Sequence, residues 1–295
     1  MRGGKVTAKS DVVATNTVEH RMSTQISRRK ALHLGLGSCL ALGGWPGAEA
    51  ARPRPAAASF RFLVVNDTHS TGPECAPWLE GLVRQMQRHA PIAFCLHLGD
   101  ITDKGLAPHL TETRRIFDQL GFPLYAQLGN HDYATPTDRS GYEQAYPGRI
   151  NYWFAHAGWQ FVGLDSTEGQ LYDKTHIQPA TFAFLDRALP QLDRRLPTVL
   201  FTHFPLHEGV RYRPLNAEAV LERFLEFNLR AVFSGHWHGY TQVISRGAFL
   251  VTNRCCARVR ENHGGGKEKG YWLCTVEGHG LTREFVEYGG PDGAV

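Results

Sequence analysis

Short apolar runs alternate with amphipathic stretches along most of the chain from residue 60 onward. Five runs have the length and composition of strands buried on both faces; they are Phe60–Val65, Ile92–Leu98, Leu124–Leu128, Thr198–Thr202 and Ala231–Ser234. Four other stretches carry apolar residues at helical spacing: Trp78–His89, Pro108–Leu120, Ala180–Leu189 and Ala217–Phe227. This alternation predicts an α/β fold built from strand–helix–strand crossovers.

A second group of strands is predicted as a hairpin and a closing set. Tyr152–His156 and Gln160–Asp165 flank a short turn, which indicates a hairpin. The closing set consists of Phe249–Asn253, Tyr271–Val276 and Thr282–Glu287. We therefore expect a single domain over residues 60–290, built as two packed sheets.

The first 50 residues are interpreted as an export leader. Arg28 and Arg29 precede a modest apolar run, residues 31–44, and Ala48-Glu49-Ala50 matches a signal-peptidase site. An Arg pair before a glycine-diluted apolar run is typical of twin-arginine signals. This interpretation implies a twin-arginine translocase as partner and a periplasmic or extracellular protein. No run is long enough for an ordinary transmembrane helix.

Two alternatives stay open within the leader. Met22 lies six residues before Arg28 and could be the true start. Leu36-Gly37-Ser38-Cys39 resembles a lipoprotein cleavage box, so a lipid on Cys39 could anchor the protein instead. Residues 51–59 are rich in Ala and Pro and are predicted to be a linker.

Composition and charge exclude two broad classes of protein. The 295-residue chain is 42% hydrophobic and 11% aromatic, which is too apolar for a disordered protein. Residues 51–295 hold 25 basic and 25 acidic side chains, so they lack the basic footprint of a nucleic-acid-binding surface. Five Cys follow residue 50, and an odd number argues against a complete disulfide framework. The role of the vicinal Cys255 and Cys256 stays open.

Polar residues gather where the five buried strands end. The segments that follow the strands are Asn66-Asp67-Thr68-His69, Gly99-Asp100-Ile101-Thr102-Asp103, Gly129-Asn130-His131-Asp132, His203 and Gly235-His236-Trp237-His238. In an open α/β sheet, ligands bind outside the carboxyl ends of the strands. We therefore expect these five segments to converge on one site.

The residue types at these strand ends favour a metal centre. Seven donors are available: Asp67, His69, Asp100, Asn130, His203, His236 and His238. Imidazole, carboxylate and amide groups suit borderline or hard divalent ions, and seven donors are too many for one tetrahedral site. The set predicts two ions that share a bridging carboxylate. An extended backbone would point both side chains of each i, i+2 pair to the same side.

The order of these segments resembles that of the calcineurin-like metallophosphoesterases, including small bacterial members similar to cyclic-nucleotide phosphodiesterases. The resemblance runs from Asp67 to His238. It implies a two-sheet β-sandwich flanked by helices, an α/β/β/α fold of four layers. It also implies two divalent or mixed-valence ions of Mn, Fe or Zn. The implied ligands are Asp67, His69 and His238 for the first metal, Asn130, His203 and His236 for the second, and Asp100 as the bridge.

The same resemblance assigns catalytic roles to two further residues. His131 would contact the phosphoryl group or protonate the leaving oxygen, and the Asp103 side chain would orient His131. Protein Ser/Thr phosphatases carry Asp-Arg-Gly and a Glu after Gly-Asn-His, whereas this chain has Lys104 and Asp132 at those positions. A protein phosphatase of that type is therefore not expected.

These roles imply an exported hydrolase of small phosphomonoesters or phosphodiesters. Coordination would lower the pKa of bound water from about 16 to about 7, and the resulting hydroxide would attack phosphorus. No motif fixes the substrate, but four residues are candidates for binding a distal phosphate: Arg211, Arg213, Arg254 and Arg258. Two other functions stay open: a non-catalytic scaffold on the same fold, and a metallohydrolase that acts on another bond.

Overall fold

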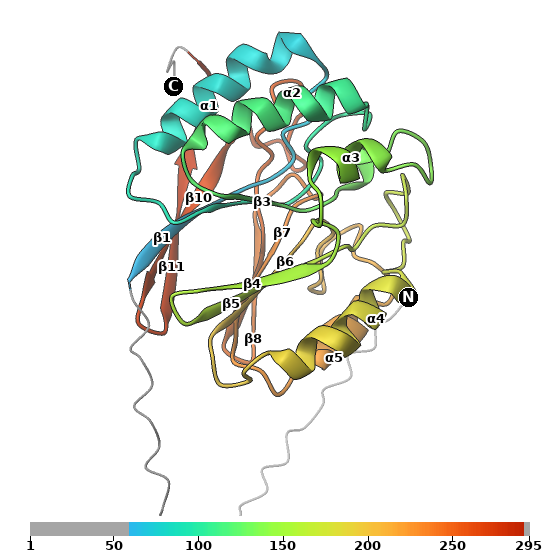
Figure 1. Ribbon diagram of the computed structural model, residues 1–295, viewed down its shortest axis with the longest axis vertical. Coiled ribbons are helices and arrows are strands. Elements are labelled where there is room, and N and C mark those ends of the chain that lie inside the picture. The colour runs from blue at the N-terminus through green and yellow to red at the C-terminus, as the bar shows by residue number, and fades with distance from the viewer. Residues whose placement is uncertain (1–58, 292–295) are drawn as a thin grey trace, which may run out of the picture. The chain divides into compact units, whose positions relative to one another are not determined.

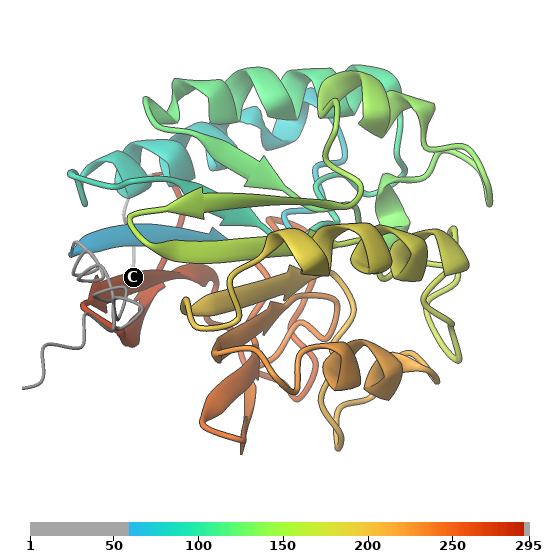
Figure 2. The ribbon, with the colours of Figure 1, turned by 60° about the horizontal axis from the view of Figure 1, so that its bottom comes forward.

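The computed structural model describes residues 59–291, so the predicted leader and all but Ser59 of the predicted linker lie outside the described residues. The described chain forms two β-sheets that pack face to face, with helices on both outer faces (Figure 1 and Figure 2). This four-layer α/β/β/α arrangement confirms the fold class expected from the sequence.

The first sheet has the strand order β11-β10-β1-β2-β3. Its strands are β1 (Phe60–Val65), β2 (Cys95–His97), β3 (Leu124–Ala126), β10 (Gly270–Glu277) and β11 (Gly280–Glu287). Strands β1, β2 and β3 are parallel, whereas β10 and β11 join as an antiparallel hairpin. Helices α1 (Ala76–Gln87) and α2 (Ala107–Phe117) cover the outer face of this sheet.

The second sheet has the strand order β4-β5-β6-β7-β9-β8. Its strands are β4 (Tyr152–His156), β5 (Trp159–Leu164), β6 (Thr198–Thr202), β7 (Leu229–Ser234), β8 (Thr241–Ser245) and β9 (Ala248–Thr252). The four inner strands are parallel, and the two edge strands are antiparallel to their neighbours. Helices α4 (Pro179–Ala188) and α5 (Ala217–Arg223) cover its outer face.

Alternation along the strands explains why apolar side chains pack both between the two sheets and beneath the helices on each outer face. In β1, Phe62 and Val64 face the second sheet, while Leu63 and Val65 face α1 and α2. In β6, Phe201 points into the layer between the sheets and Leu200 points toward α4 and α5. Each such buried side chain contributes about 1.5–3 kcal/mol relative to an exposed one. Continuous apolar runs are therefore required, because both faces of these strands are covered.

The structure departs from the sequence-based elements mainly at their ends. The predicted strand Ile92–Leu98 shortens to β2, because its first residues pair irregularly, as when Ala93 N–H donates to the Arg61 carbonyl at 2.8 Å. Two elements were not predicted from the sequence: β8, a largely exposed edge strand, and the six-residue helix α3 (Ser140–Ala145). Within residues 59–291, no helix is long and apolar enough to cross a membrane.

Candidate metal centre

Five parallel strands bring the predicted donors together at their carboxyl ends. β1 leads to Asp67 and His69, β2 to Asp100, β3 to Asn130, β6 to His203, and β7 to His236 and His238. All seven side chains are buried, with at most 7% of any residue exposed. Because strands of both sheets point the same way, segments far apart in sequence meet at one place.

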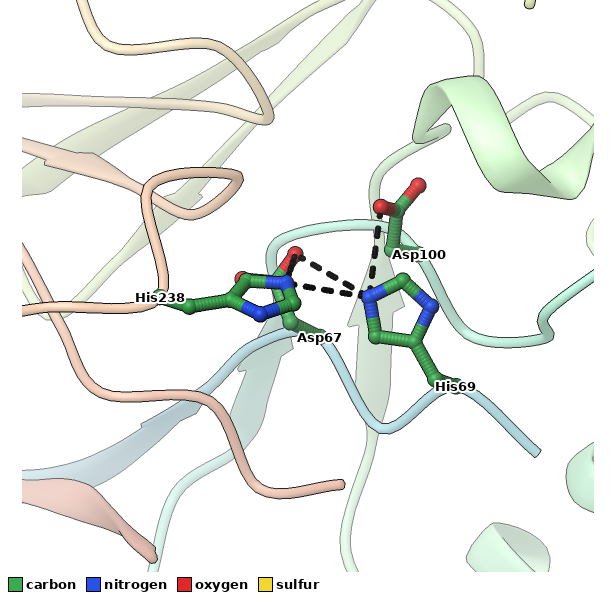
Figure 3. Close-up of side chains that lie close together, drawn as sticks. All are labelled: Asp67, His69, Asp100 and His238. Carbon is green, nitrogen blue, oxygen red and sulfur yellow. Dashed lines mark hydrogen bonds and ion pairs between the residues drawn. The ribbon is translucent and has the colours of Figure 1, made fainter. Parts of the chain in front are cut away.

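The buried acids and histidines form two overlapping clusters. Within each, the potential ligand atoms lie within 4.8 Å of one another; the first holds Asp67, His69, Asp100 and His238, and the second holds Asp100, His203 and His236. Figure 3 shows the first cluster, with the His69 and His238 rings facing each other beside the two carboxylates. Asp100 belongs to both clusters, which is the position a bridging ligand requires.

Asn130 joins the second cluster through His203. The Nε2 atom of His203 lies 3.1 Å from Asn130 Oδ1 and 3.3 Å from Asp100 Oδ1. It also lies 3.2 Å from Nδ1 of His236. The two clusters together therefore contain all seven donors that the sequence singled out.

The backbone at five of these donors is left-handed rather than extended, so the expected conformation of the i, i+2 pairs was wrong. The φ angles are 52° at Asp67, 42° at His69, 51° at Asp100, 64° at His236 and 45° at His238. Non-glycine residues with positive φ cost free energy, and they concentrate at functional sites. The chain turns sharply as it leaves each strand, and His236 and His238 consequently point into different clusters.

The Asp132 side chain connects the segments that follow β2 and β3 by hydrogen bonds. Its carboxylate accepts the backbone N–H groups of Gly129 (3.0 Å), Ile101 (3.2 Å) and Thr102 (2.9 Å). Burial, with the Asp100 charge beside it, raises the pKa of Asp132 to about 7. The two segments approach so closely that a Cβ at Gly129 would lie 2.1 Å from the Asp100 nitrogen. The sequence had marked Asp132 only as a departure from the protein phosphatases.

The outer ring nitrogens of three histidines contact main-chain carbonyls. His203 Nδ1 lies 2.9 Å from the Leu98 oxygen, His236 Nε2 lies 3.1 Å from the Tyr172 oxygen, and His238 Nδ1 lies 3.1 Å from the Glu261 oxygen. A carbonyl oxygen only accepts, so each of these nitrogens donates. The opposite nitrogen of each ring is thereby left to face inward as a potential metal ligand.

The inward-facing nitrogens and carboxylates fit a cation. His69 Nε2 and His238 Nε2 lie 3.0 Å apart, a contact that needs a proton or a cation between two lone pairs. Burial disfavours the charged form of His203, but the Asp100 carboxylate outweighs it and raises the pKa of His203 to about 9. Burial likewise opposes the charge on Asp67, yet His238 holds the pKa of Asp67 well below its usual range. The negative charges of the Asp67 and Asp100 carboxylates favour the binding of divalent ions at this place.

His131 is oriented by the main chain of Asp103, not by its carboxylate as expected from the resemblance. His131 Nδ1 lies 2.9 Å from the Asp103 carbonyl oxygen. The Asp103 carboxylate instead pairs with Arg260 and lies 3.4 Å from Nδ1 of His69. The carboxylate nevertheless stays near His131, because His69, Asp103 and His131 offer potential ligand atoms within 4.8 Å of one another.

A cleft of about 620 Å³ opens over the two clusters. Its lining includes Tyr172, Tyr212, Arg260 and His263, which the sequence had not singled out individually. The aromatic side chains form one wall, since Tyr212 lies 5.3 Å from the His236 ring centroid and 5.8 Å from that of Tyr172. They come from loops in which no regular spacing marks them.

Three of the four candidate phosphate-binding arginines have other contacts. Arg213 bonds Glu218 and the Leu206 carbonyl, and Arg254 pairs with Glu268 at 3.5 Å. Arg211 lies over the Tyr212 ring at 4.8 Å from its centroid. The five Cys of the described chain are all buried and form no disulfide.

Comparisons with known proteins assign the fold and the site to a family. The sequence profile described as calcineurin-like phosphoesterase matches residues 60–240, which include all seven donors. The chain belongs to the calcineurin-like phosphoesterase family. The family match and the buried Asp/His clusters make the protein a metal-dependent phosphoesterase, and they decide against the scaffold and the hydrolase of another bond.

Two curated bacterial proteins are similar in sequence. A probable cyclic nucleotide phosphodiesterase of Rhodopseudomonas palustris is 27% identical over 220 residues, covering 64% of this chain and 78% of that protein. A 3',5'-cyclic adenosine monophosphate phosphodiesterase of Pseudomonas aeruginosa is 26% identical over 196 residues, covering 61% and 70%.

The fold is also similar to that of a solved purple acid phosphatase from yellow lupin. The TM-score is 0.57 at 14% sequence identity, with 81% of this chain and 53% of the lupin chain covered. This chain thus spans about half the length of the lupin enzyme, and the likeness concerns the fold alone.

Proposed function

We propose that this phosphoesterase hydrolyses phosphodiesters of nucleotide size, with cyclic nucleotides as the first candidates. The observation that carries the proposal is the cleft of about 620 Å³, which joins the metal clusters to an aromatic wall. Its volume lies within the range of about 300–1,000 Å³ that is usual for small-molecule sites. The two bacterial relatives, whose names describe cyclic nucleotide phosphodiesterases, support the same substrate class.

The charges of the cleft support a diester over a monoester. Two cationic side chains line the cleft, Lys104 and Arg260, and Arg260 is paired with Asp103, which leaves little positive charge for a dianionic ester. A diester carries one negative charge, whereas a monoester carries close to two at neutral pH. The second organic group of a diester would also gain contact with Tyr172 and Tyr212, because aromatic faces bind bases by stacking.

We propose that the seven buried donors hold two divalent ions, with Asp100 shared between them. Bound there, the ions would polarise the phosphoryl group and lower the pKa of a water molecule at the site. The chain supplies the remaining steps. Asn130 and His131 place an amide and an imidazole beside the clusters, on the segment that Asp132 anchors.

His131 is the proposed acid for the leaving group. Its Nδ1 donates to the Asp103 carbonyl, which fixes the ring and leaves Nε2 as its other proton-carrying atom. In its doubly protonated form, His131 would donate the Nε2 proton to the departing ester oxygen. A positioned acid of this kind is worth roughly 10²–10⁴-fold in rate.

The substrate proposal is tested by comparing esters on the purified chain reconstituted with Mn²⁺. Cyclic AMP, bis(p-nitrophenyl) phosphate and p-nitrophenyl phosphate distinguish a nucleotide diester, a simple diester and a monoester. We expect kcat/KM to be highest for a diester and to fall by about tenfold or more for the monoester, a difference of about 1.4 kcal/mol. Preference for the monoester would contradict the proposal.

We also propose export through the twin-arginine route, from residues that lie outside the described part of the chain. The support is the sequence of the leader, with Arg28, Arg29 and Ala48-Glu49-Ala50. Replacing both Arg28→Lys and Arg29→Lys should retain the protein in the cytoplasm, as measured by cell fractionation. Normal export of that variant would contradict this route, and a lipid on Cys39 detected by mass spectrometry would replace it with the lipoprotein route.

A further inference from the structure

We propose that Arg260 is a positioning residue for the first metal, acting through Asp103 on His69. Arg260 lies in the segment 253–269, which connects β9 to β10 and follows the family-matched residues 60–240. The inference depends on the proposed metal ligands and not on which phosphate ester is hydrolysed.

The contact between Arg260 and Asp103 is direct and uses two nitrogens. Nε and Nη2 of Arg260 donate to Oδ1 of Asp103 at 2.9 and 2.5 Å. The same oxygen lies 3.4 Å from Nδ1 of His69, within ion-pair distance, and this buried nitrogen has no hydrogen-bond partner in the described part of the chain. Contact with His69, together with the pairing to Arg260, holds the pKa of Asp103 well below its usual range.

This arrangement sets the orientation of the His69 ring. A carboxylate that accepts a proton from Nδ1 leaves Nε2 as the metal-binding nitrogen, and outer contacts of this kind also raise the basicity of the ligand. Nε2 of His69 lies on the cluster side, 3.5 Å from Asp100 Oδ2 and 3.0 Å from His238 Nε2. Asp103 is partly exposed, so without the guanidinium its carboxylate could rotate toward water.

The outer ring nitrogen of His69 faces a side chain, whereas the outer ring nitrogens of the other ligand histidines contact main-chain carbonyls. The outer nitrogens of His203 and His236 contact the carbonyl oxygens of Leu98 and Tyr172. The position of a main-chain carbonyl is set by the backbone, whereas the Asp103 side chain can adopt several rotamers. Arg260 supplies the constraint that selects one of them.

The segment 253–269 is itself built to present Arg260. The Asn262 side chain accepts from Cys255 N–H at 2.9 Å and donates to the carbonyls of Gly266 and Glu268. Lys269 Nζ contacts the Arg260 carbonyl and lies 3.0 Å from Cys255 Sγ. The neighbouring Glu261 carbonyl accepts from His238, so the segment contacts a second histidine of the first cluster.

The test is the affinity for Mn²⁺ alone, measured by calorimetric titration of the chelator-treated full chain. Arg260→Ala should weaken the binding of one of the two ions by about 10–100-fold, as loss of outer-sphere partners usually does, and leave the affinity for the other ion unchanged. Arg260→Lys should recover part of the loss. Arg254→Ala is the matched control, because Arg254 lies on the same segment but pairs with Glu268.

A double substitution separates this relay from a general loosening of the segment. Adding Asp103→Asn to Arg260→Ala should cost little more than either change alone, because both interrupt one relay. Wild-type affinity for both ions in Arg260→Ala would overturn the proposal, as would an equal loss in Arg254→Ala. A rise in KM with unchanged metal affinity would also overturn it by making Arg260 a substrate contact. If Arg260→Ala does not fold, Arg260→Gln and Asp103→Asn are judged by the same readout.

Discussion

The metal centre has two halves that are held in different ways. The first half is the cluster of Asp67, His69, Asp100 and His238, and the second half is the cluster of Asp100, His203 and His236. In the second half, His203 and His236 donate to main-chain carbonyls, and both carbonyls belong to residues 60–240. In the first half, His69 relies on the Asp103 carboxylate and Arg260, while His238 donates to Glu261 in the segment beyond. The second half is therefore held through main-chain carbonyls, one of them in the loop at Tyr172, whereas the first half is held through the Arg260–Asp103 side chains and the loop carbonyl of Glu261.

This difference predicts that the two halves respond unequally to chelators and to substitutions outside the ligand set. A main-chain carbonyl survives substitution of its own side chain, whereas a side-chain relay can be removed by one change. We expect the first half to lose its ion at a lower chelator concentration than the second. We also expect single substitutions outside the ligand set to act mainly on the first half.

The largest effect should come from the residue that both halves share. Asp100→Asn keeps the shape of the side chain but removes the charge that both clusters use, so both ions should bind more weakly. Loss of several kcal/mol of transition-state stabilisation would lower kcat by about 10³-fold or more. Elemental analysis together with kcat measures both consequences. Two tightly held ions in Asp100→Asn would show that Asp100 is not the bridge.

Removing one histidine from each half should cost one ion in each case. His203→Ala should spare the first half, and His238→Ala should spare the second, because these side chains belong to different clusters. We expect one ion per chain in each variant and a fall in kcat of about 10²-fold, which corresponds to about 2.7 kcal/mol. Equal loss of both ions from either variant would mean that the two halves do not bind their ions independently.

His131 should affect turnover without affecting either half. His131→Ala should keep two ions and lose roughly 10²–10⁴-fold in kcat, most of all for esters with poor leaving groups. Asp103→Asn should behave differently, since it leaves the carbonyl that holds His131 in place. Its defect should appear in metal affinity. Comparing p-nitrophenyl and alkyl esters tests the statement on His131, and a Mn²⁺ titration tests the statement on Asp103. Loss of metal from His131→Ala would make His131 a ligand.

The smallest effect concerns the loop that supports the first half. Asn262→Ala removes three hydrogen bonds within the segment 253–269 but no contact to a ligand. We expect the first ion to bind about fivefold more weakly, equivalent to about 1 kcal/mol. Asn228→Ala, which removes a bond to Arg195 on the surface, is the matched control. An effect on the second ion would contradict the separation of the halves.

Sequence patterns predicted what the strands determine and missed what the loops determine. The runs that became β1, β6 and β7 are buried on both faces, so their apolar composition and the polar residues at their ends were visible. The left-handed backbone at Asp67 and His236 was not, because it arises where the chain must turn after each strand. Arg260, Tyr172 and Tyr212 lie in loops without periodicity, and only their three-dimensional neighbours reveal them. The Asp103 carboxylate was assigned to His131 from the family resemblance, and a shared motif does not tell a side-chain contact from a main-chain one.

The most direct test of a centre with two unequal halves is a stepwise Mn²⁺ titration of the chelator-treated chain, followed by bound metal and by activity together. We expect two ions per chain, with the second half filling first and activity appearing only as the weaker first-half ion binds. In Arg260→Ala, the second step alone should move to higher Mn²⁺ concentration. Full activity with a single ion per chain, or two steps that shift together in that variant, would contradict this expectation.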